Sequence, residues 1–306
     1  MDKKLQKNIN ENPYFKYFFD EVFDSNCFKN VSASDMVAII SSAEYVFRRT
    51  AKGDFTDLFY TNLYKAEKTL IDRLTEEKAA YIICSKKPDV PFLSPYGVLQ
   101  DHVLSICVNE KSAETLCCNL FSSEGFYCFS KNEEDLKNYI FKMRGVLGIL
   151  AVDIYNENSE SVHILLSDLY VYYPSENESR DREELSRSLV IFDEIQLCSK
   201  KAEYCFRGQY QKNTVEKISS LLDSTSLYVP VDKKTKLVFP YIETDLRGKS
   251  IPVFTDYYLA KEMFPEEDFL ITPVLVRWLQ KLSGITSFII NPNFQDFTFA
   301  AQNTSL

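Results

Sequence analysis

The stretch "YIICSKKPDVPF", Tyr81 to Phe92, returns without a gap 147 residues further on as "YVPVDKKTKLVF", Tyr228 to Phe239. Each copy has an apolar run, a turn containing Lys-Lys and a second apolar run, a pattern typical of a β-hairpin. The same offset pairs Ile71 with Ile218 in the helix expected before each hairpin. Because self-similarity at a fixed offset marks a repeated structural unit, the sequence predicts two copies of one module.

The segments that follow the two hairpins also correspond. Val103 to Phe121 and Ile251 to Phe264 each read as a buried strand, a capped turn and a helix. A further helix then leads into an apolar strand that ends on Asn156 in the first copy and Asn291 in the second. Each module is therefore predicted to run β-β-β-α-α-β-β. Such mixtures favour an α+β fold, here two tandem related domains, each a mixed or antiparallel sheet with helices packed on one face.

The predicted domain boundaries follow from this repeat and from one polar stretch. The segment "PSENESRDREE", Pro174 to Glu184, is charged and lacks apolar periodicity, which favours a linker. Aromatic residues before the first copy recur at helical spacing, which indicates a helical N-terminal segment. The predicted parts are a helical segment at 1–55, the first domain at 56–174, the linker at 175–184, and the second domain with its preceding helices at 185–306.

Charge and hydropathy limit the partners of the chain. Its 306 residues carry a net charge of −9 without a block of lysine or arginine, whereas a nucleic-acid-binding face needs clustered basic residues. The N-terminus lacks the apolar core of a secretory signal. The longest apolar run, Val146 to Val152, is far shorter than the roughly 20 residues that span a bilayer. We expect no nucleic-acid and no membrane partner, and a cytoplasmic location.

Cysteine and histidine provide no recognisable metal or catalytic motif. None of the eight cysteines forms a Cys-x-x-Cys pair and the chain has two histidines, so we predict no metal site and no cofactor. The cysteines are interpreted as small buried hydrophobic residues; as the alternative, Cys117 and Cys118 could act as a redox sensor. No G-x-S-x-G motif is present. His102 and His163 are interpreted as structural, and no catalytic residue is predicted.

Two motifs of the second copy, "IPVFTDYYLAKEMF" and "GITSFIINPN", resemble the N-terminal domain of the bacterial SseB family, which is named for enhanced serine sensitivity. The resemblance covers Tyr228 to Thr298. The first copy is a degenerate match, since Ile106 to Asn109 replaces the Pro-Val-Phe-Thr turn between strand and helix. The resemblance implies a bacterial α+β domain. It supplies no catalytic residues.

Four residues of the second copy are candidates for ligand binding: Thr255, Asp256, Trp278 and Asn291. Thr255 and Asp256 begin a helix, where they could bind an anion or simply cap the helix. Asn291 ends a strand, where its amide could contact a ligand; alternatively, the Asn-Pro pair only terminates the strand. Trp278 is expected to anchor its helix to the sheet, or otherwise to stack on a ligand.

Three functions are consistent with these features. The leading hypothesis is a non-catalytic cytosolic protein that binds proteins or regulates them through two SseB-like domains, in which one copy supports and the other binds. The alternative is a small-molecule sensor or enzyme with a pocket in the second domain. A third is a structural subunit of a larger assembly, docked through the aromatic N-terminal segment.

Overall fold

A computed structural model describes residues 14–300 of the chain, apart from residues 22, 51–55, 86–90, 92, 95–102, 121–126, 173–178, 205–206, 237–239, 245–247, 283–284, 286, 294 and 296. Two compact units make up the chain: unit 1 comprises Met1–Ile140 and Ile149–Tyr172, and unit 2 comprises Phe141–Gly148 and Tyr173–Leu306. Both contain helices together with antiparallel and mixed sheets, which confirms the predicted α+β class. The division into domains stays a prediction, and residues 175–178 of the predicted linker lie outside the described residues.

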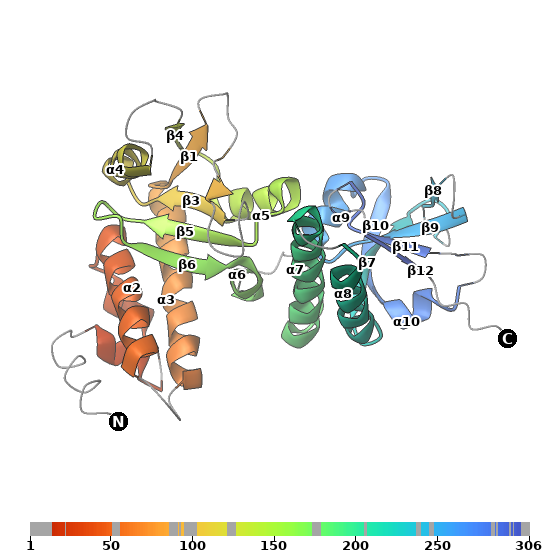
Figure 1. The fold of residues 1–306 in the computed structure, drawn as a ribbon, viewed down its shortest axis with the longest axis horizontal. Coiled ribbons are helices and arrows are strands. Elements are labelled where there is room, and N and C mark those ends of the chain that lie inside the picture. Colours follow the sequence, from red (N-terminus) through yellow and green to blue (C-terminus); the bar gives the residue numbers. More distant parts are fainter. Residues whose placement is uncertain are drawn as a thin grey trace. The chain divides into compact units, whose positions relative to one another are not determined.

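Unit 1 is built on a sheet with the strand order β4-β1-β3-β5-β6, in which β2 also pairs with β3 (Figure 1). Strands β3 and β5 are parallel and the other neighbours are antiparallel. The strands are β1 (Tyr81–Ser85), β2 (Leu93–Ser94), β3 (Val103–Cys107), β4 (Tyr127–Lys131), β5 (Ala151–Tyr155) and β6 (Ser161–Leu165). The helices are η1 (Phe15–Phe18), η2 (Ser25–Phe28), α2 (Ala33–Thr50), α3 (Thr56–Glu77), α4 (Glu110–Leu120), α5 (Leu136–Leu147) and α6 (Leu166–Tyr172). The residues of α5 from Phe141 onward belong to unit 2.

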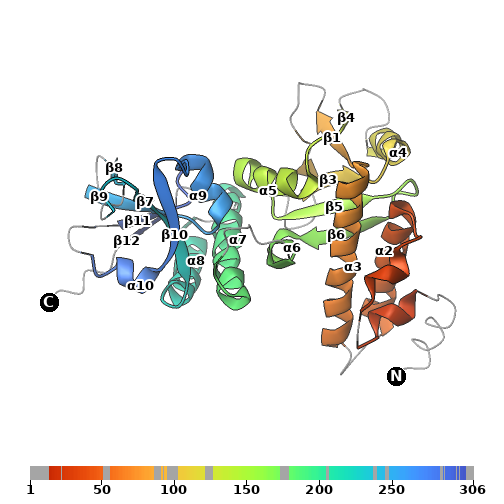
Figure 2. The ribbon, with the colours of Figure 1, turned by 180° about the vertical axis from the view of Figure 1, so that it is seen from behind.

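Helices cover the central strands of unit 1. Helices α2 and α3 lie side by side along the sheet (Figures 1 and 2). On the side of the sheet that carries Ile83 and Cys107, α4 packs with Ala113 and Leu116. All five residues of β3 are buried. A strand that is covered on both sides is expected to read as a continuous apolar run, as "VLSIC" largely does.

Unit 2 contains two described sheets, with the orders β10-β7 and β12-β11-β9-β8. Tyr228 of β7 and Phe254, the residue after β9, join them by two backbone hydrogen bonds of 2.8 Å. The strands are β7 (Ser226–Asp232), β8 (Ile242–Thr244), β9 (Gly248–Val253), β10 (Phe269–Leu275), β11 (Ser287–Ile290) and β12 (Phe297–Ala300). The helices are α7 (Arg182–Tyr204), α8 (Arg207–Leu222), α9 (Tyr257–Met263) and α10 (Val276–Leu279).

The two faces of the unit 2 sheet are packed differently. On one face, aliphatic residues of α7, α8 and α10 contact β7, β9, β11 and β12. On the other face α9 forms an aromatic layer, with the ring of Tyr257 5.5 Å from that of Tyr228 and the ring of Phe264 5.9 Å from that of Phe254. Helices therefore lie on both faces of this sheet, whereas the sequence analysis predicted one face. In β7 apolar residues lie on both sides, Leu227 and Val229 on one and Tyr228 and Pro230 on the other, which is why each face needs a cover.

The strand pairings of the two units match position by position. Tyr81 pairs with Cys107 in unit 1, and Tyr228 pairs with Phe254 in unit 2; both members of the second pair lie 147 residues after those of the first. The parallel strands also pair in corresponding places: Val103 pairs with Ala151 and Ser250 with Ser287, where the first members are 147 residues apart and the second members 136. The offset found at the hairpins therefore also relates residues that pair across the sheet.

Two details of the predicted element order are wrong. A strand separates the two helices of each module, β4 in unit 1 and β10 in unit 2, so the order is β-β-β-α-β-α-β-β. Thr272 to Leu275 belong to the stretch "TPVLVRWLQKLSG", which the sequence predicts as the helix before the strand that ends on Asn291; in the structure they lie in β10 and pair with β7. β-Branched residues in "FLITPVL" favour the strand, and the predicted helix is reduced to the four residues of α10. Residues 237–239, part of the second apolar run of the hairpin predicted in the second copy, lie outside the described residues.

Candidate functional site

Three of the four predicted site residues meet at the carboxyl ends of two parallel strands. Thr255 and Asp256 follow β9, and Asn291 follows β11, which runs parallel to β9. Carboxyl ends of neighbouring parallel strands are a common place for ligands in α/β sheets. Here, however, Thr255 and Asn291 are completely buried and Asp256 is 3% exposed. Whether a ligand can bind here therefore depends on what the polar atoms of these three residues already contact within the protein.

The side-chain amide of Asn291 uses its hydrogen-bonding atoms within the protein. Its Oδ1 accepts from the backbone N–H of Thr255 at 2.9 Å, and its Nδ2 donates to Thr255 Oγ1 at 3.1 Å and to Gln295 Oε1 at 2.7 Å. The Asn291 backbone has φ of +50°, which asparagine tolerates better than most residues. A ligand at this position would have to displace one of these bonds. We therefore interpret Asn291 as a buried connection between the two strand ends.

Asp256 caps helix α9. Its Oδ1 accepts a hydrogen bond of 3.0 Å from the backbone N–H of Leu259, the usual geometry of an N-cap. The carboxylate thus occupies the start of a helix of only seven residues, and its negative charge opposes an anion there. The capping hypothesis fits this geometry, and the anion-binding hypothesis does not.

Two residues that the sequence analysis did not select complete this cluster. Gln295 donates through Nε2 to the carbonyl oxygen of Phe192 on α7 at 2.9 Å. Arg180, which was assigned to the linker, is 8% exposed and donates to the carbonyl oxygens of Ser226 and Thr255, each at 3.1 Å. Its guanidinium also lies 4.5 Å from the centre of the Tyr228 ring. The polar run around Arg180 indicated solvent exposure, so its sequence carried no signal of a buried role.

Trp278, the fourth predicted site residue, does not belong to this cluster and is exposed. Its side chain on α10 is 64% exposed, while Val276 and Leu279 of the same helix are buried. The prediction that Trp278 anchors its helix to the sheet is wrong, because Val276 and Leu279 form that contact. Leu282, four residues further on, is 38% exposed.

The corresponding position of unit 1 is closed by different residues. Asn109, 147 residues before Asp256, caps α4 by accepting from the backbone N–H of Ser112 at 2.8 Å. Its Nδ2 lies 3.4 Å from Glu157 Oε2, which also accepts from Ser34 Oγ at 2.6 Å. The hydrogen bond from Ser34 is the main cause that lowers the pKa of Glu157. The carboxylate of Glu157 thus lies beside the helix cap where unit 2 has the amide of Asn291, while the buried amide of Asn156 donates to Ser34 O and Glu160 Oε2.

One further polar pair lies across strands β5 and β6. His163 Nδ1 is 2.7 Å from Asp153 Oδ1, and Tyr155 donates to Asp153 Oδ2 at 3.2 Å. Asp153 is 2% exposed and the side chain of His163 is 28% exposed. This contact fits the structural interpretation of His163. His102 lies outside the described residues.

Neither a metal cluster nor a membrane-spanning helix occurs in the described part of the chain. Among those residues, no group of three or more His, Cys, Asp or Glu side chains is placed to hold a metal ion. No described helix is both long enough and apolar enough to cross a bilayer. The apolar gap in unit 2 beside Leu227, Val253 and Phe288 is too small for a water molecule.

Comparisons with protein-family models, with curated proteins and with solved structures give no match in any of the three.

Proposed function

We propose that the chain is a bacterial, cytoplasmic, non-catalytic protein that binds proteins or regulates them through two copies of an SseB-like module, with the binding surface on unit 2. The observation that carries this proposal is the exposure of Trp278. Tryptophan is highly buried on average in folded proteins, and it is enriched among the residues that dominate protein–protein binding. In this proposal unit 1 has a supporting role and unit 2 binds the partner protein.

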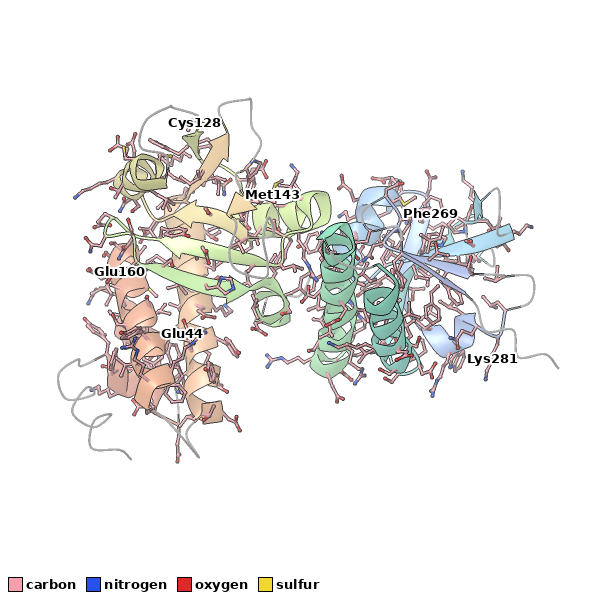
Figure 3. All side chains as sticks on the ribbon, viewed as in Figure 1. Glu44, Cys128, Met143, Glu160, Phe269 and Lys281 are labelled. Atoms are coloured by element: carbon pink, nitrogen blue, oxygen red, sulfur yellow. The ribbon has the colours of Figure 1, made fainter. Side chains whose placement is uncertain are left out.

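The proposed binding surface consists of Arg277, Trp278, Lys281 and Leu282, and we name it the α10 surface. All four side chains are exposed, and residues four apart are neighbours on a helical turn. The backbone bonds from Lys281 N to Trp278 O and from Leu282 N to Leu279 O, both 3.1 Å, continue the turn beyond α10. Figure 3 labels Lys281 at the end of this helix. The surface therefore combines two apolar side chains with two cations.

The chemistry of this surface selects an acidic protein segment with apolar side chains. No ion pair joins Arg277 or Lys281 to another described residue, although the chain has a net charge of −9. A tryptophan buries about 150 to 250 Å². Covering the exposed part of Trp278 would therefore contribute about 3 kcal/mol, before the entropy cost of association. Two cations alone give little attraction to a lipid surface, since each contributes only about 1 kcal/mol.

Fluorescence of Trp278 tests the proposal, because it is the only tryptophan of the chain. The probes are short peptides in which Glu or Asp alternates with Leu or Phe, and the same peptides with Lys in place of the acids. We expect the acidic set to shift the emission to the blue. The double variant Arg277→Glu/Lys281→Glu should bind that set at least about tenfold more weakly, an effect of about 1.4 kcal/mol, and should prefer the basic set.

The matched control is Leu270→Ala, which removes another exposed apolar side chain of unit 2 (56% exposed) outside the α10 surface. It should bind the acidic peptides as the unaltered protein does. The proposal would be overturned if no acidic peptide changed the emission of Trp278, or if only anionic lipid vesicles changed it.

The alternative function, a small-molecule sensor or enzyme with a pocket at Asn291, requires a ligand that replaces Gln295 or Thr255 as the partner of the amide. A thermal-shift screen against metabolites and nucleotides tests it. A reproducible shift with one compound class, together with loss of the Asn291 contact to Gln295 in a complex, would support this alternative over the α10 surface.

A further inference from the structure

Five of the cysteines gather in unit 1, around strand β4 and helix α4. Cys84 lies on β1, Cys107 on β3, Cys117 and Cys118 on α4, and Cys128 on β4. In the antiparallel pairing of β1 with β4, Cys84 and Cys128 are direct partners. Figure 3 labels Cys128 on β4. No local sequence pattern indicates this pairing, because 44 positions separate the two residues and their strands are not consecutive.

The spacing of directly opposite residues in an antiparallel pair suits a disulfide. Their Cα atoms lie about 4.5 to 5.5 Å apart, within the range of about 4.4 to 6.8 Å that disulfides span. Their Cβ atoms lie about 4.5 to 5.5 Å apart, so bond formation draws them together by about 0.7 to 1.7 Å, to the mean disulfide separation of about 3.8 Å. Strand β4 can make this movement because it is an edge strand with β1 as its neighbour in the described sheet.

The two sulfur atoms share one face of the sheet. Cys84 Sγ is 3.7 Å from Ser130 Oγ, which places Ser130 on the face of Cys84. Residues two apart in a strand point to the same side, so Cys128 also lies on that face. Rotation of Cys84 about χ1 would turn its sulfur from Ser130 towards Cys128.

We propose that Cys84 and Cys128 are a redox modification site, at which a low-molecular-weight disulfide such as oxidised glutathione converts the two thiols into a reversible cross-strand disulfide. Cys128 is exposed and Cys84 is 5% exposed. The small disulfide therefore reacts first at Cys128. The thiol of Cys84 then attacks the adduct. A second small molecule has little access to Cys84, because this residue is buried.

The reaction is balanced by two thiol–disulfide exchanges. The thiolate of Cys128 attacks one sulfur of the small disulfide, which forms a mixed disulfide and releases one small thiol. Cys84, having lost its proton to solvent, attacks the Cys128 sulfur and releases the second small thiol. The protein loses two electrons and two hydrogens, and the small disulfide gains them. The bond ties an edge strand to its neighbour, and reduction reverses it.

The neighbouring thiols are poorer partners. Cys107 pairs with Tyr81 and packs with α4 on the opposite face, and burial raises the pKa of its thiol. The pKa of Cys117 is also raised, first by burial and next by the proximity of Cys128. A protonated thiol is a weak nucleophile, so both should react more slowly than exposed Cys128.

The experiment incubates the full chain with oxidised glutathione, alkylates the remaining thiols and measures the mass. Two of the eight cysteines should escape alkylation. Digestion without reductant, by trypsin together with a glutamate-specific protease, separates Cys128 from Cys117 and Cys118 by cleavage after Glu124. The linked peptides should contain Cys84 and Cys128. Reduced glutathione should release them.

Variants distinguish this pair from its neighbours. Cys128→Ser, at an exposed position, should abolish the cross-link and leave the fold intact, whereas Cys118→Ser, the matched exposed control on α4, should form it to the same extent. Amide exchange in Tyr127–Lys131 should slow on oxidation in the unaltered protein and in Cys118→Ser, but not in Cys128→Ser. A cross-link from Cys128 to Cys117 or Cys118, or eight alkylated thiols after treatment, would overturn the proposal.

Discussion

Units 1 and 2 pair their strands in the same register but close the carboxyl ends of their parallel strands with different chemistry. In unit 2 the amide of Asn291 holds Thr255, and both side chains are completely buried. In unit 1 the equivalent place brings Asn109 near Glu157, a partly exposed carboxylate bonded to Ser34. The comparison indicates that the apolar strand pattern sets the topology. A few polar residues then decide which hydrogen bonds hold each strand end.

The largest effect is expected from removing the seal in unit 2. Asn291→Ala leaves the buried N–H of Thr255 and the amide of Gln295 without their partner, at about 1 to 3 kcal/mol for each unsatisfied group. It also places alanine at a φ of +50°, which costs about 1 to 2 kcal/mol. We expect the free energy of unfolding to fall by about 4 kcal/mol, measured by denaturant titration.

Asn293→Ala is the matched control for this prediction, because Asn293 also has a positive φ, +64°, but is exposed. It should lose about 1 kcal/mol, from backbone strain. Equal losses at the two positions would show that the buried amide contributes nothing beyond strain.

A second difference between the units is a buried acid in the helical layer of unit 1. Glu67 on α3 is 5% exposed, and no hydrogen bond or ion pair joins it to another described residue. Burial is the main cause that raises its pKa well above 4.5, and the carboxyl groups of Glu44 and Asp168 raise it further. The buried carboxylate found in unit 2, Asp256, instead caps a helix.

This acid predicts that stability falls as pH rises. Above about pH 4.5 the unfolded chain releases the Glu67 proton while the folded chain retains it. The free energy of unfolding therefore decreases until the pKa of the folded state is reached, by at most about 1.4 kcal/mol per pH unit for one proton. Glu67→Gln should flatten this slope in urea titrations at several pH values. Glu76→Gln, an exposed substitution on the same helix, should retain it.

The sequence predicted the α+β class and the repeat offset, and it selected Thr255 and Asn291 as candidate residues, because apolar periodicity and strand ends are local patterns. It missed β10, since the apolar residues of "TPVLV" run directly into the helical spacing around Trp278. A helix of only four residues, α10, is too short for its periodicity to mark where the strand ends and the helix begins. It missed Arg180 because, in a sequence, an arginine whose guanidinium is buried against carbonyl oxygens cannot be told from an arginine exposed to solvent. The pairing of Cys84 with Cys128 depends on the order of strands in the sheet, which no local pattern encodes.

The smallest effects are expected at the two helix caps, where the units are most alike. Asn109→Ala and Asp256→Ala each remove a side-chain acceptor from the third helical N–H, and each should lower the free energy of unfolding by about 1 kcal/mol. Equal losses would confirm that both side chains stabilise their helices as N-caps. A loss at one position alone would show that only that side chain does so.

Exchanging the two caps sharpens this comparison, because Asn and Asp cap helices about equally well. Asp256→Asn should stay within about 0.5 kcal/mol of the unaltered protein for that reason. Asn109→Asp places a second carboxylate beside Glu157, and like charges at this spacing should cost about 1 kcal/mol in exposed surroundings. Because the pKa of Glu157 is lowered, the penalty should persist at neutral pH and disappear only in acid, as Glu157 protonates. A penalty that does not change with pH would mean that the two caps differ by packing and not by charge.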